Sequence, residues 1–129
     1  MDNKTKKELG ILGENIAAEY LKKHGYKIIK RNYRNRLGEI DIIAYEGAVL
    51  CFIEVKTRAD EQRGRPEEAV GKAKQRKISQ VVLSYLKMQG IYEGNFRFDV
   101  AAVMFNEITN VKKINLIKNA FELDDQYSF

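Results

Sequence analysis

The alternation of apolar and polar residues along the chain predicts two helices and five strands. Near the N-terminus, apolar side chains recur at the spacing of one helical face, at Leu9, Leu12, Ile16, Tyr20 and Leu21. Two lysines and His24 follow, and then Gly25, which is typical of the basic last turn and the stop of a helix. We therefore expect the first helix to end near His24.

Five segments have the short apolar runs of β-strands, and we place them at 26–34, 38–45, 48–57, 96–105 and 111–117. Between the third and fourth strands, Pro66 begins a second helix that ends before Gly90. Its apolar stripe consists of Val70, Ile78, Val81, Val82, Tyr85 and Leu86. Lys74 lies in line with this stripe, so the first half of the helix should project beyond the packed sheet, toward the mouth of a site or toward solvent.

The order of these elements predicts the topology. Short turns join the first three strands, which should form an antiparallel meander, whereas a helical crossover makes the third and fourth strands parallel. The fold class is therefore α/β, with a mixed five-stranded sheet flanked by helices. The chain contains no repeat, low-complexity tract or linker, and its 129 residues are expected to form a single domain.

Acidic residues on the central hairpin form the candidate site. If Glu46 and Gly47 make a two-residue turn, Glu39 lies opposite Glu54, and Asp41 becomes a diagonal neighbour of Glu54 on the same face. A register shifted by two residues would put Asp41 directly opposite Glu54. A shift of one residue would send the two acids to opposite faces and remove the site.

The same face carries apolar residues and one lysine, at Ile43, Leu50, Phe52 and Lys56. Carboxylates beside an apolar surface repel one another unless a positive charge lies between them. A divalent cation together with Lys56 would supply that charge, and oxygen ligands suit Mg²⁺ or Mn²⁺. This pattern is typical of phosphodiester hydrolysis, although a structural network of ion pairs would also gather such charges.

Several longer motifs resemble the YraN family of predicted bacterial endonucleases. They are Gly13-Glu14, the run NYRNRLGEIDIIA from Asn32 to Ala44, the run FIEVKTR from Phe52 to Arg58, Phe98-Asp99-Val100 and Asn119-Ala120-Phe121. The family is related to the archaeal Holliday junction resolvases of the PD-(D/E)xK superfamily. The resemblance covers nearly the whole chain and implies a restriction-endonuclease-like fold and a DNA-cleaving activity.

The resemblance also implies a role for individual residues. Asp41 and Glu54 would bind the metal together with the carbonyl of Val55, and Lys56 would be the lysine of the superfamily. Glu14 matches an additional acidic residue that resolvases place near the metal, and Gln75 matches, more loosely, a polar helix residue that faces the site. Two positions depart from the pattern: Ile40 replaces the proline before the aspartate, and Asn15 replaces a basic residue of the resolvases. The second departure weakens the expectation of specificity for four-way junctions.

The basic residues agree with a nucleic-acid partner. Lysine and arginine number 23 against 18 acidic residues, which gives a net charge of +5 and an isoelectric point near 9.3. Seven basic side chains bracket the candidate site in sequence and are expected to bind DNA phosphates, namely Arg34, Arg36, Arg58, Arg65, Lys72, Lys74 and Arg76. For each of them a solvated helix or strand face remains the alternative.

The remaining sequence features favour a cytoplasmic protein. Cys51 is the single cysteine and lies in an apolar strand, which excludes an internal disulfide. No segment is long and apolar enough to span a membrane, and the N-terminus lacks the apolar core of a signal peptide.

The sequence thus predicts an endonuclease that depends on Mg²⁺ or Mn²⁺ and acts on DNA, with branched or irregular DNA as candidate substrates. A resolvase-like role would require a symmetric homodimer, so that two sites could cut two strands. Two alternatives stay open: a catalytically inactive nucleic-acid-binding module with the same fold, and a protein-interaction domain in which the acids are structural.

Overall fold

The structure is a computed structural model that describes residues 6–58, 71–106 and 111–122. The described residues form two helices and five strands: α1 (Lys6–Lys23), β1 (Tyr26–Asn35), β2 (Gly38–Glu46), β3 (Val49–Arg58), α2 (Lys72–Gln89), β4 (Asn95–Asn106) and β5 (Val111–Phe121). The predicted helix start at Pro66 and the predicted DNA contact Arg65 lie outside the described residues. The end of the first helix agrees with the prediction to within one residue.

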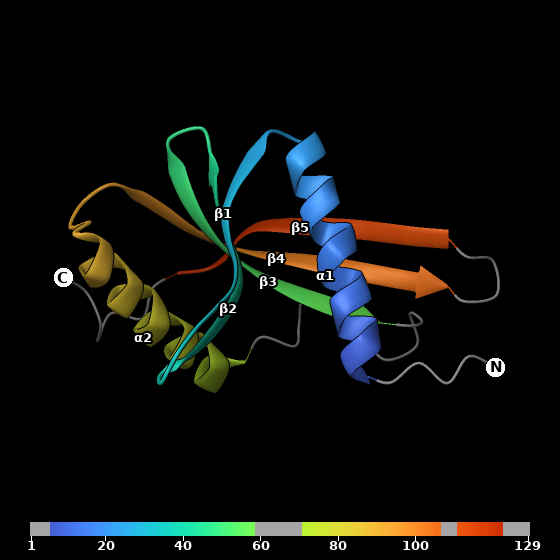
Figure 1. Ribbon diagram of the computed structural model, residues 1–129, viewed down its shortest axis with the longest axis horizontal. Helices are drawn as coiled ribbons and strands as arrows, with labels where there is room; N and C mark the ends of the chain where they lie inside the picture. Colours follow the sequence, from blue (N-terminus) through green and yellow to red (C-terminus); the bar gives the residue numbers. More distant parts are fainter. Residues whose placement is uncertain (1–5, 59–70, 107–110, 123–129) are drawn as a thin grey trace.

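The five strands form one mixed sheet in the order β1-β2-β3-β4-β5 (Figure 1). Strands β1, β2 and β3 pair in antiparallel fashion, β3 and β4 are parallel, and β5 returns antiparallel to β4. Helix α2 lies in the connection between the two parallel strands, as a crossover must. The predicted α/β fold, with its meander, crossover and mixed sheet flanked by helices, is confirmed.

The turn between β2 and β3 differs from the prediction. Glu46 pairs with Val49 and Tyr45 with Leu50, so the two turn residues are Gly47 and Ala48. Gly47 has a φ of 59°, which a residue without a Cβ adopts readily at the first central position of a hairpin turn. The predicted register is therefore wrong by two residues. Because the shift is even, the side chains of the paired segments, from Ile42 to Glu46 and from Val49 to Ile53, keep the predicted faces.

Each face of the sheet carries its own apolar core beneath one helix. The core on the α1 side consists of Ala17, Ala18, Leu21, Tyr26, Ile42, Ala44, Cys51, Ile53, Ala101 and Val103. The core on the α2 side consists of Ile40, Ile43, Leu50, Phe52, Ile78, Val81, Val82, Tyr85, Leu86, Phe98 and Val100. Since consecutive residues of β3 alternate between the two cores, this strand is the buried centre of the sheet.

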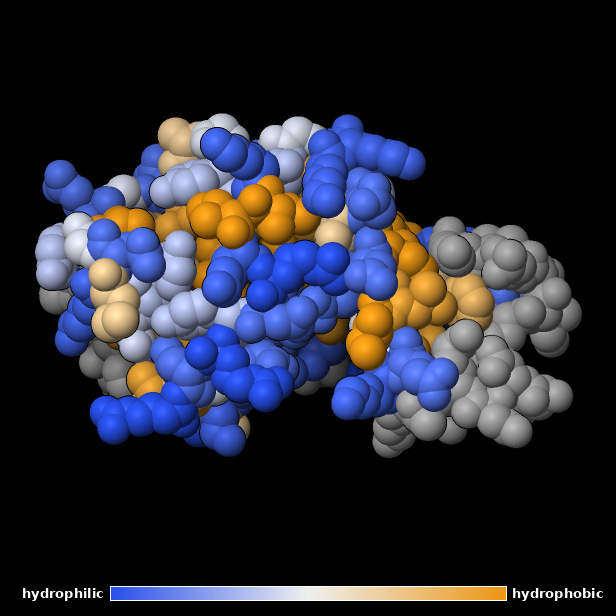
Figure 2. Space-filling view, in the orientation of Figure 1, coloured by the Kyte–Doolittle hydropathy of each residue, from blue (hydrophilic) through white to orange (hydrophobic). Residues whose placement is uncertain are grey.

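Helix α1 approaches the sheet closely at Gly13. A Cβ atom at this position would overlap the Oγ1 atom of Thr57 on β3 and would lie 2.9 Å from its Cβ. The face of the molecule that carries α1 shows apolar patches among its hydrophilic side chains (Figure 2). The missing side chain at Gly13 thus sets the distance between α1 and the end of β3 that carries the candidate site.

Neither of the two described helices is apolar enough along its length to cross a membrane.

Candidate functional site

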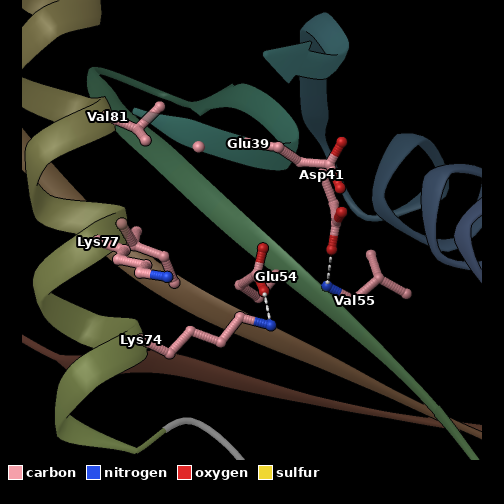
Figure 3. A pocket seen from close by; sticks show the side chains of 9 residues that line it. Glu39, Asp41, Glu54, Val55, Lys74, Lys77 and Val81 are labelled. Atoms are coloured by element: carbon pink, nitrogen blue, oxygen red, sulfur yellow. Dashed lines mark hydrogen bonds and ion pairs between the residues drawn. The ribbon is translucent and has the colours of Figure 1, made fainter. Parts of the chain in front are cut away.

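A cavity of about 360 Å³ opens between the β2–β3 hairpin and helix α2 (Figure 3). Its lining residues come from three elements: Gly38, Glu39 and Asp41 from β2, Glu54 and Val55 from β3, and Lys74, Lys77, Ile78 and Val81 from α2. The two acids that the sequence analysis paired, Asp41 and Glu54, therefore line one cavity. The two lysines on α2 face them from the opposite wall.

The β1–β2 hairpin changes face beside this cavity. Arg31 contacts Glu14 of α1, whereas Tyr33, two residues later, packs edge-on against Tyr85 of α2 with ring centroids 5.1 Å apart. Regular alternation would put both side chains on one face. Asn32, which lies between them, has a φ of 54°, a left-handed conformation that asparagine tolerates better than most residues.

The partner strand changes face at the same level. Ile42 belongs to the core on the α1 side and Ile40 to the core on the α2 side, and Asp41 lies between them. The pairing of β2 with β3 ends at Ile42 and Ile53, immediately before Asp41. The change of face in the β1–β2 hairpin therefore takes Asp41 out of regular pairing with β3. Its carboxylate lies beside the backbone of Val55 on β3.

On the β2 side of β3, the side chain of Asp41 takes the place of a backbone hydrogen-bond partner for Val55. The backbone N–H of Val55 donates a hydrogen bond to the Oδ2 atom of Asp41 at 2.8 Å. Burial, and after it the nearby carboxylate of Glu54, raise the pKa of Asp41 to about 7. The two carboxylates thus lie close enough to repel each other, which is the electrostatic condition that favours a bound cation.

Glu54 has two ammonium neighbours. Its side chain is buried, and its Oε2 atom lies 2.9 Å from Nζ of Lys74 and 4.0 Å from Nζ of Lys56. Burial, and after it the adjacent Lys74, lower the pKa of Lys56 to about 8. Lys74 projects from the first turn of α2 into the cavity, as its place in the apolar stripe predicted.

Glu14 approaches the site from the other face of the sheet. Its charge contributes to the raised pKa of Asp41, so it is close enough to act on that carboxylate. Its own Oε1 atom is 3.3 Å from the guanidinium of Arg31, which also donates a hydrogen bond to Asn15 at 2.6 Å. Glu14 is therefore near Asp41 but engaged by an arginine, and it does not line the cavity.

Gln75 does not line the cavity either. The residues of α2 that do so are Lys74, Lys77, Ile78 and Val81, which recur at the spacing of one helical face. Gln75 is half-buried beside that face. On α2, Lys74 is the lining residue that forms an ion pair with one of the acids, at 2.9 Å from Oε2 of Glu54.

The predicted DNA contacts differ in their surroundings. Arg34 is exposed and forms an ion pair with Glu39 at 2.6 Å, and Arg36 is exposed at the end of β1 and β2. Arg58 donates a hydrogen bond to the carbonyl of Thr57. Lys72 and Arg76 are exposed on the first turns of α2, beside Lys74. Arg58, Lys72 and Arg76 therefore lie on β3 and α2, which line the cavity. Arg34 lies on β1 and Arg36 in the turn between β1 and β2, while Arg65 is not among the described residues.

Asp99 anchors a second polar cluster, to which the sequence analysis assigned no role. Its carboxylate is buried and accepts two hydrogen bonds from Arg97, at 2.8 and 2.9 Å, and one from the backbone N–H of Asn119 at 3.0 Å. Arg97 also contacts the hydroxyl of Tyr26 and the carboxylate of Glu46, each at 2.8 Å. In the sequence, the sign of this cluster is the spacing of Arg97 and Asp99, two residues apart and therefore on one face of a strand. The cluster is a structural ion-pair network.

The donor set at the cavity fits a hard divalent cation. Asp41 and Glu54 supply carboxylate oxygens, and the carbonyl of Val55 could add a third oxygen. Within residues 6–58, 71–106 and 111–122, no three acidic, histidine or cysteine side chains are placed to hold a metal ion together. An ion bound by Asp41 and Glu54 would therefore need further ligands. A cation that keeps several waters and binds substrate phosphate, as Mg²⁺ and Mn²⁺ do, suits this set best.

Comparisons with known proteins identify relatives across most of the chain. The model of the family described as "Uncharacterised protein family UPF0102" matches residues 13–103, a range that includes both acids and both lysines of the cavity. A UPF0102 protein of Alkaliphilus metalliredigens is 50% identical over 115 residues, which cover 89% of this chain and 98% of the relative. A UPF0102 protein of Clostridium kluyveri is 44% identical over 117 residues, covering 91% and 96% of the two chains.

Proposed function

Because the chain belongs to the uncharacterised protein family UPF0102, whose description states no activity, we propose a function from the site itself. The protein is a metal-dependent endonuclease that hydrolyses phosphodiester bonds in DNA, with Mg²⁺ or Mn²⁺ as its cofactor. Its place of action is the cytoplasm. Branched or otherwise irregular DNA is the candidate substrate.

One observation carries this proposal: Asp41, Glu54 and Lys74, from three different elements, line one cavity, and Lys56 lies beside Glu54. Asp41 and Glu54 are brought together despite burial and mutual repulsion, and Lys56 and Lys74 reach the same oxygen of Glu54. A cluster of ionisable groups whose pKa values are shifted, and which lies in a surface cavity, is typical of a catalytic site. The network around Asp99 offers a contrast within the same molecule, because its buried carboxylate accepts hydrogen bonds from Arg97 and from the backbone N–H of Asn119.

The residues divide the chemistry among themselves. When bound, the cation supplies a Lewis acid that polarises a phosphoryl oxygen and acidifies a water. Asp41 and Glu54 hold it, and the N–H of Val55 fixes the orientation of Asp41. Lys56, whose pKa is lowered to about 8, donates hydrogen bonds to the attacking water or to the phosphate, and stabilises the negative charge that grows in the transition state.

The surface around the cavity supports a polyanionic substrate. Lys72 and Arg76 are exposed on α2, and Arg34 and Arg36 are exposed on the opposite hairpin. These side chains can bind phosphates on both sides of the cleaved bond, which gives affinity and position without sequence specificity.

A cleavage assay tests the proposal. The purified full chain is incubated with linear duplex, flapped, single-stranded and four-way DNA, each with Mg²⁺, with Mn²⁺ and with EDTA. We expect cleavage of at least one DNA structure with a metal and none with EDTA. Asp41→Asn and Glu54→Gln should each lower the rate by about 100-fold or more, because each removes a charge that holds the cation.

Glu19→Gln is the matched control for these variants. Glu19 is an exposed acid on α1 whose described partner is Lys22, so the variant loses the same charge far from the cavity. It should cleave at the wild-type rate. If the wild-type protein binds these DNA structures but cuts none of them with either metal, the protein is a nucleic-acid-binding module and the proposed activity is wrong.

A further inference from the structure

The acid at the centre of the cavity is already neutralised by this chain's own lysines. Lys74 lies 2.9 Å from Oε2 of Glu54, and Lys56 lies 4.0 Å from the same atom. A buried carboxylate needs such a partner, because it is costly to leave an ionised group unpaired in a low-dielectric site. The dashed line at Glu54 in Figure 3 therefore joins this acid to the ammonium group of Lys74 on the opposite wall of the cavity.

The two lysines differ in their freedom to leave. Lys56 follows Glu54 by two residues on the same central strand, and its side chain is only 15% exposed. Lys74 comes from the first turn of α2, and its side chain is 43% exposed. A lysine has four rotatable bonds along its stem, so Lys74 can swing its ammonium group by several ångströms without any movement of the backbone.

Distance makes Lys74 the principal partner of Glu54. Its Nζ atom lies 2.9 Å from Oε2 of Glu54, within the range of a charge-assisted hydrogen bond, whereas Nζ of Lys56 lies 4.0 Å from the same atom. Lys74 is therefore the partner that a metal ion would have to displace from Glu54.

Lys74 has an alternative partner at hand in a DNA phosphate. Lys77 follows it by one helical turn and lines the same cavity wall. Two ammonium groups at this spacing can hold one phosphate group between them. A phosphate that enters the cavity would thus draw Lys74 away from Glu54 and toward the helix.

From this geometry we propose that Lys74 is an exchangeable counter-ion of Glu54, which yields the carboxylate to a divalent cation when a DNA phosphate takes the ammonium group. The inference rests on the proposed function. The exchange makes metal and DNA bind cooperatively. The metal ion frees Lys74 from Glu54 for the phosphate, and the phosphate frees Glu54 from Lys74 for the metal ion. In the absence of DNA, Lys74 competes with the cation for Glu54 and keeps metal affinity low.

Calorimetric titration of Mn²⁺ into the DNA-free protein tests the competition. Lys74→Met should bind Mn²⁺ about tenfold more tightly than wild type, because the competing charge is gone. Lys87→Met is the matched control: it removes one positive charge from the exposed last turn of the same helix and should leave Mn²⁺ affinity within about twofold of wild type. Equal or weaker Mn²⁺ binding by Lys74→Met would overturn the inference.

The second measurement is the coupling between the two ligands. DNA affinity is measured by fluorescence anisotropy, with and without Mn²⁺, on a phosphorothioate-linked duplex that resists cleavage. In the wild type, Mn²⁺ should strengthen DNA binding, and this gain should shrink severalfold in Lys74→Met but persist in Lys87→Met. The same gain in all three proteins would contradict the exchange.

Glu54→Gln separates this inference from the function on which it rests. If the wild type binds Mn²⁺ and Glu54→Gln does not, the metal site is supported, and the behaviour of Lys74→Met then decides the exchange alone. If Glu54→Gln binds Mn²⁺ as tightly as wild type, the ion lies elsewhere and both proposals fail.

Discussion

The backbone N–H of Val55 donates a hydrogen bond to the carboxylate of Asp41 at the point where β2 and β3 cease to pair. This contact ties the two arms of the hairpin together beyond the last regular pair. It also restrains Asp41 next to Glu54, so that the position of one acid depends on the backbone of the strand that carries the other.

The proximity of these acids predicts how the stability of the metal-free protein depends on pH. In the folded protein the pKa of Asp41 is raised to about 7 from an ordinary 3.8, so the folded state binds a proton more tightly than the unfolded state. The resulting stabilisation is complete below the unfolded value and is lost as the pH rises through 7. Urea unfolding in EDTA should show a loss of up to about 4 kcal/mol between acid and neutral pH.

Asp41→Asn isolates this contribution, because its side chain does not titrate. Its free energy of unfolding should vary less than that of wild type between pH 5 and pH 8, and it should be the more stable protein at pH 8. If the free energies of unfolding of the two proteins changed with pH in parallel, Asp41 would make no such contribution to the pH dependence of stability.

The close approach of α1 to β3 predicts opposite effects for two glycine substitutions on one helix. Gly13→Ala puts a methyl group into the space occupied by Thr57, and overpacking of this kind costs about 1–3 kcal/mol. Gly10→Ala places its methyl group where no atom lies within 4 Å, and it should stabilise the helix by about 0.5–1 kcal/mol. Thermal unfolding of both variants checks the prediction, and equal effects at the two sites would contradict it.

The left-handed conformation of Asn32 predicts which residues this position accepts. Asn32→Gly should retain wild-type stability to within about 1 kcal/mol, since glycine adopts a positive φ without strain. Asn32→Val should lose about 1–3 kcal/mol, because a β-branched residue resists that conformation. Unfolding curves measure the loss. If the valine variant relaxes by restoring regular alternation, Asp41 turns away from Val55, and Mn²⁺ binding should fall with it.

The network around Asp99 predicts a large structural effect without a direct role in cleavage. Asp99→Asn removes the buried carboxylate of the network and leaves Arg97 with Glu46 as its described acidic partner, and the loss of one partner of a buried pair costs up to about 3–5 kcal/mol. Lys118→Met, at the exposed margin of the same network, removes an ion pair with Glu46 and should cost less than about 1 kcal/mol. Chemical denaturation distinguishes the two, and similar losses would mean that the network is not anchored at Asp99.

Much of the fold could be predicted because its signals are local. The apolar stripe that contains Tyr85 and Leu86 marks α2, and the continuous apolar run around Phe52 marks β3 as a buried strand. The meander and the parallel pair then follow from the lengths of the connections. The error at the β2–β3 turn arose because Glu46-Gly47 and Gly47-Ala48 both offer a glycine to a two-residue turn, and only the structure shows which position Gly47 occupies.

The site was predictable in its acids but not in its geometry. Parity along β3 and β2 placed Glu54 and Asp41 on one face, beneath a helix, and the apolar stripe of α2 pointed Lys74 toward the mouth of a site or toward solvent; the structure shows Lys74 at the cavity. The rotation at Asn32 depends on a backbone conformation that no periodicity reveals. For the same reason the engagement of Glu14 by Arg31, which joins residues from two elements, could not be foreseen from spacing.

The single cysteine gives the protein an internal probe for these comparisons. Cys51 is fully buried in the central strand, and burial raises the pKa of its thiol to about 11. A thiol reagent can therefore modify it only after the sheet opens, and the labelling rate under native conditions reports the population of the opened form. Every variant discussed above can be ranked by this rate in plain buffer, with no denaturant and no added dye.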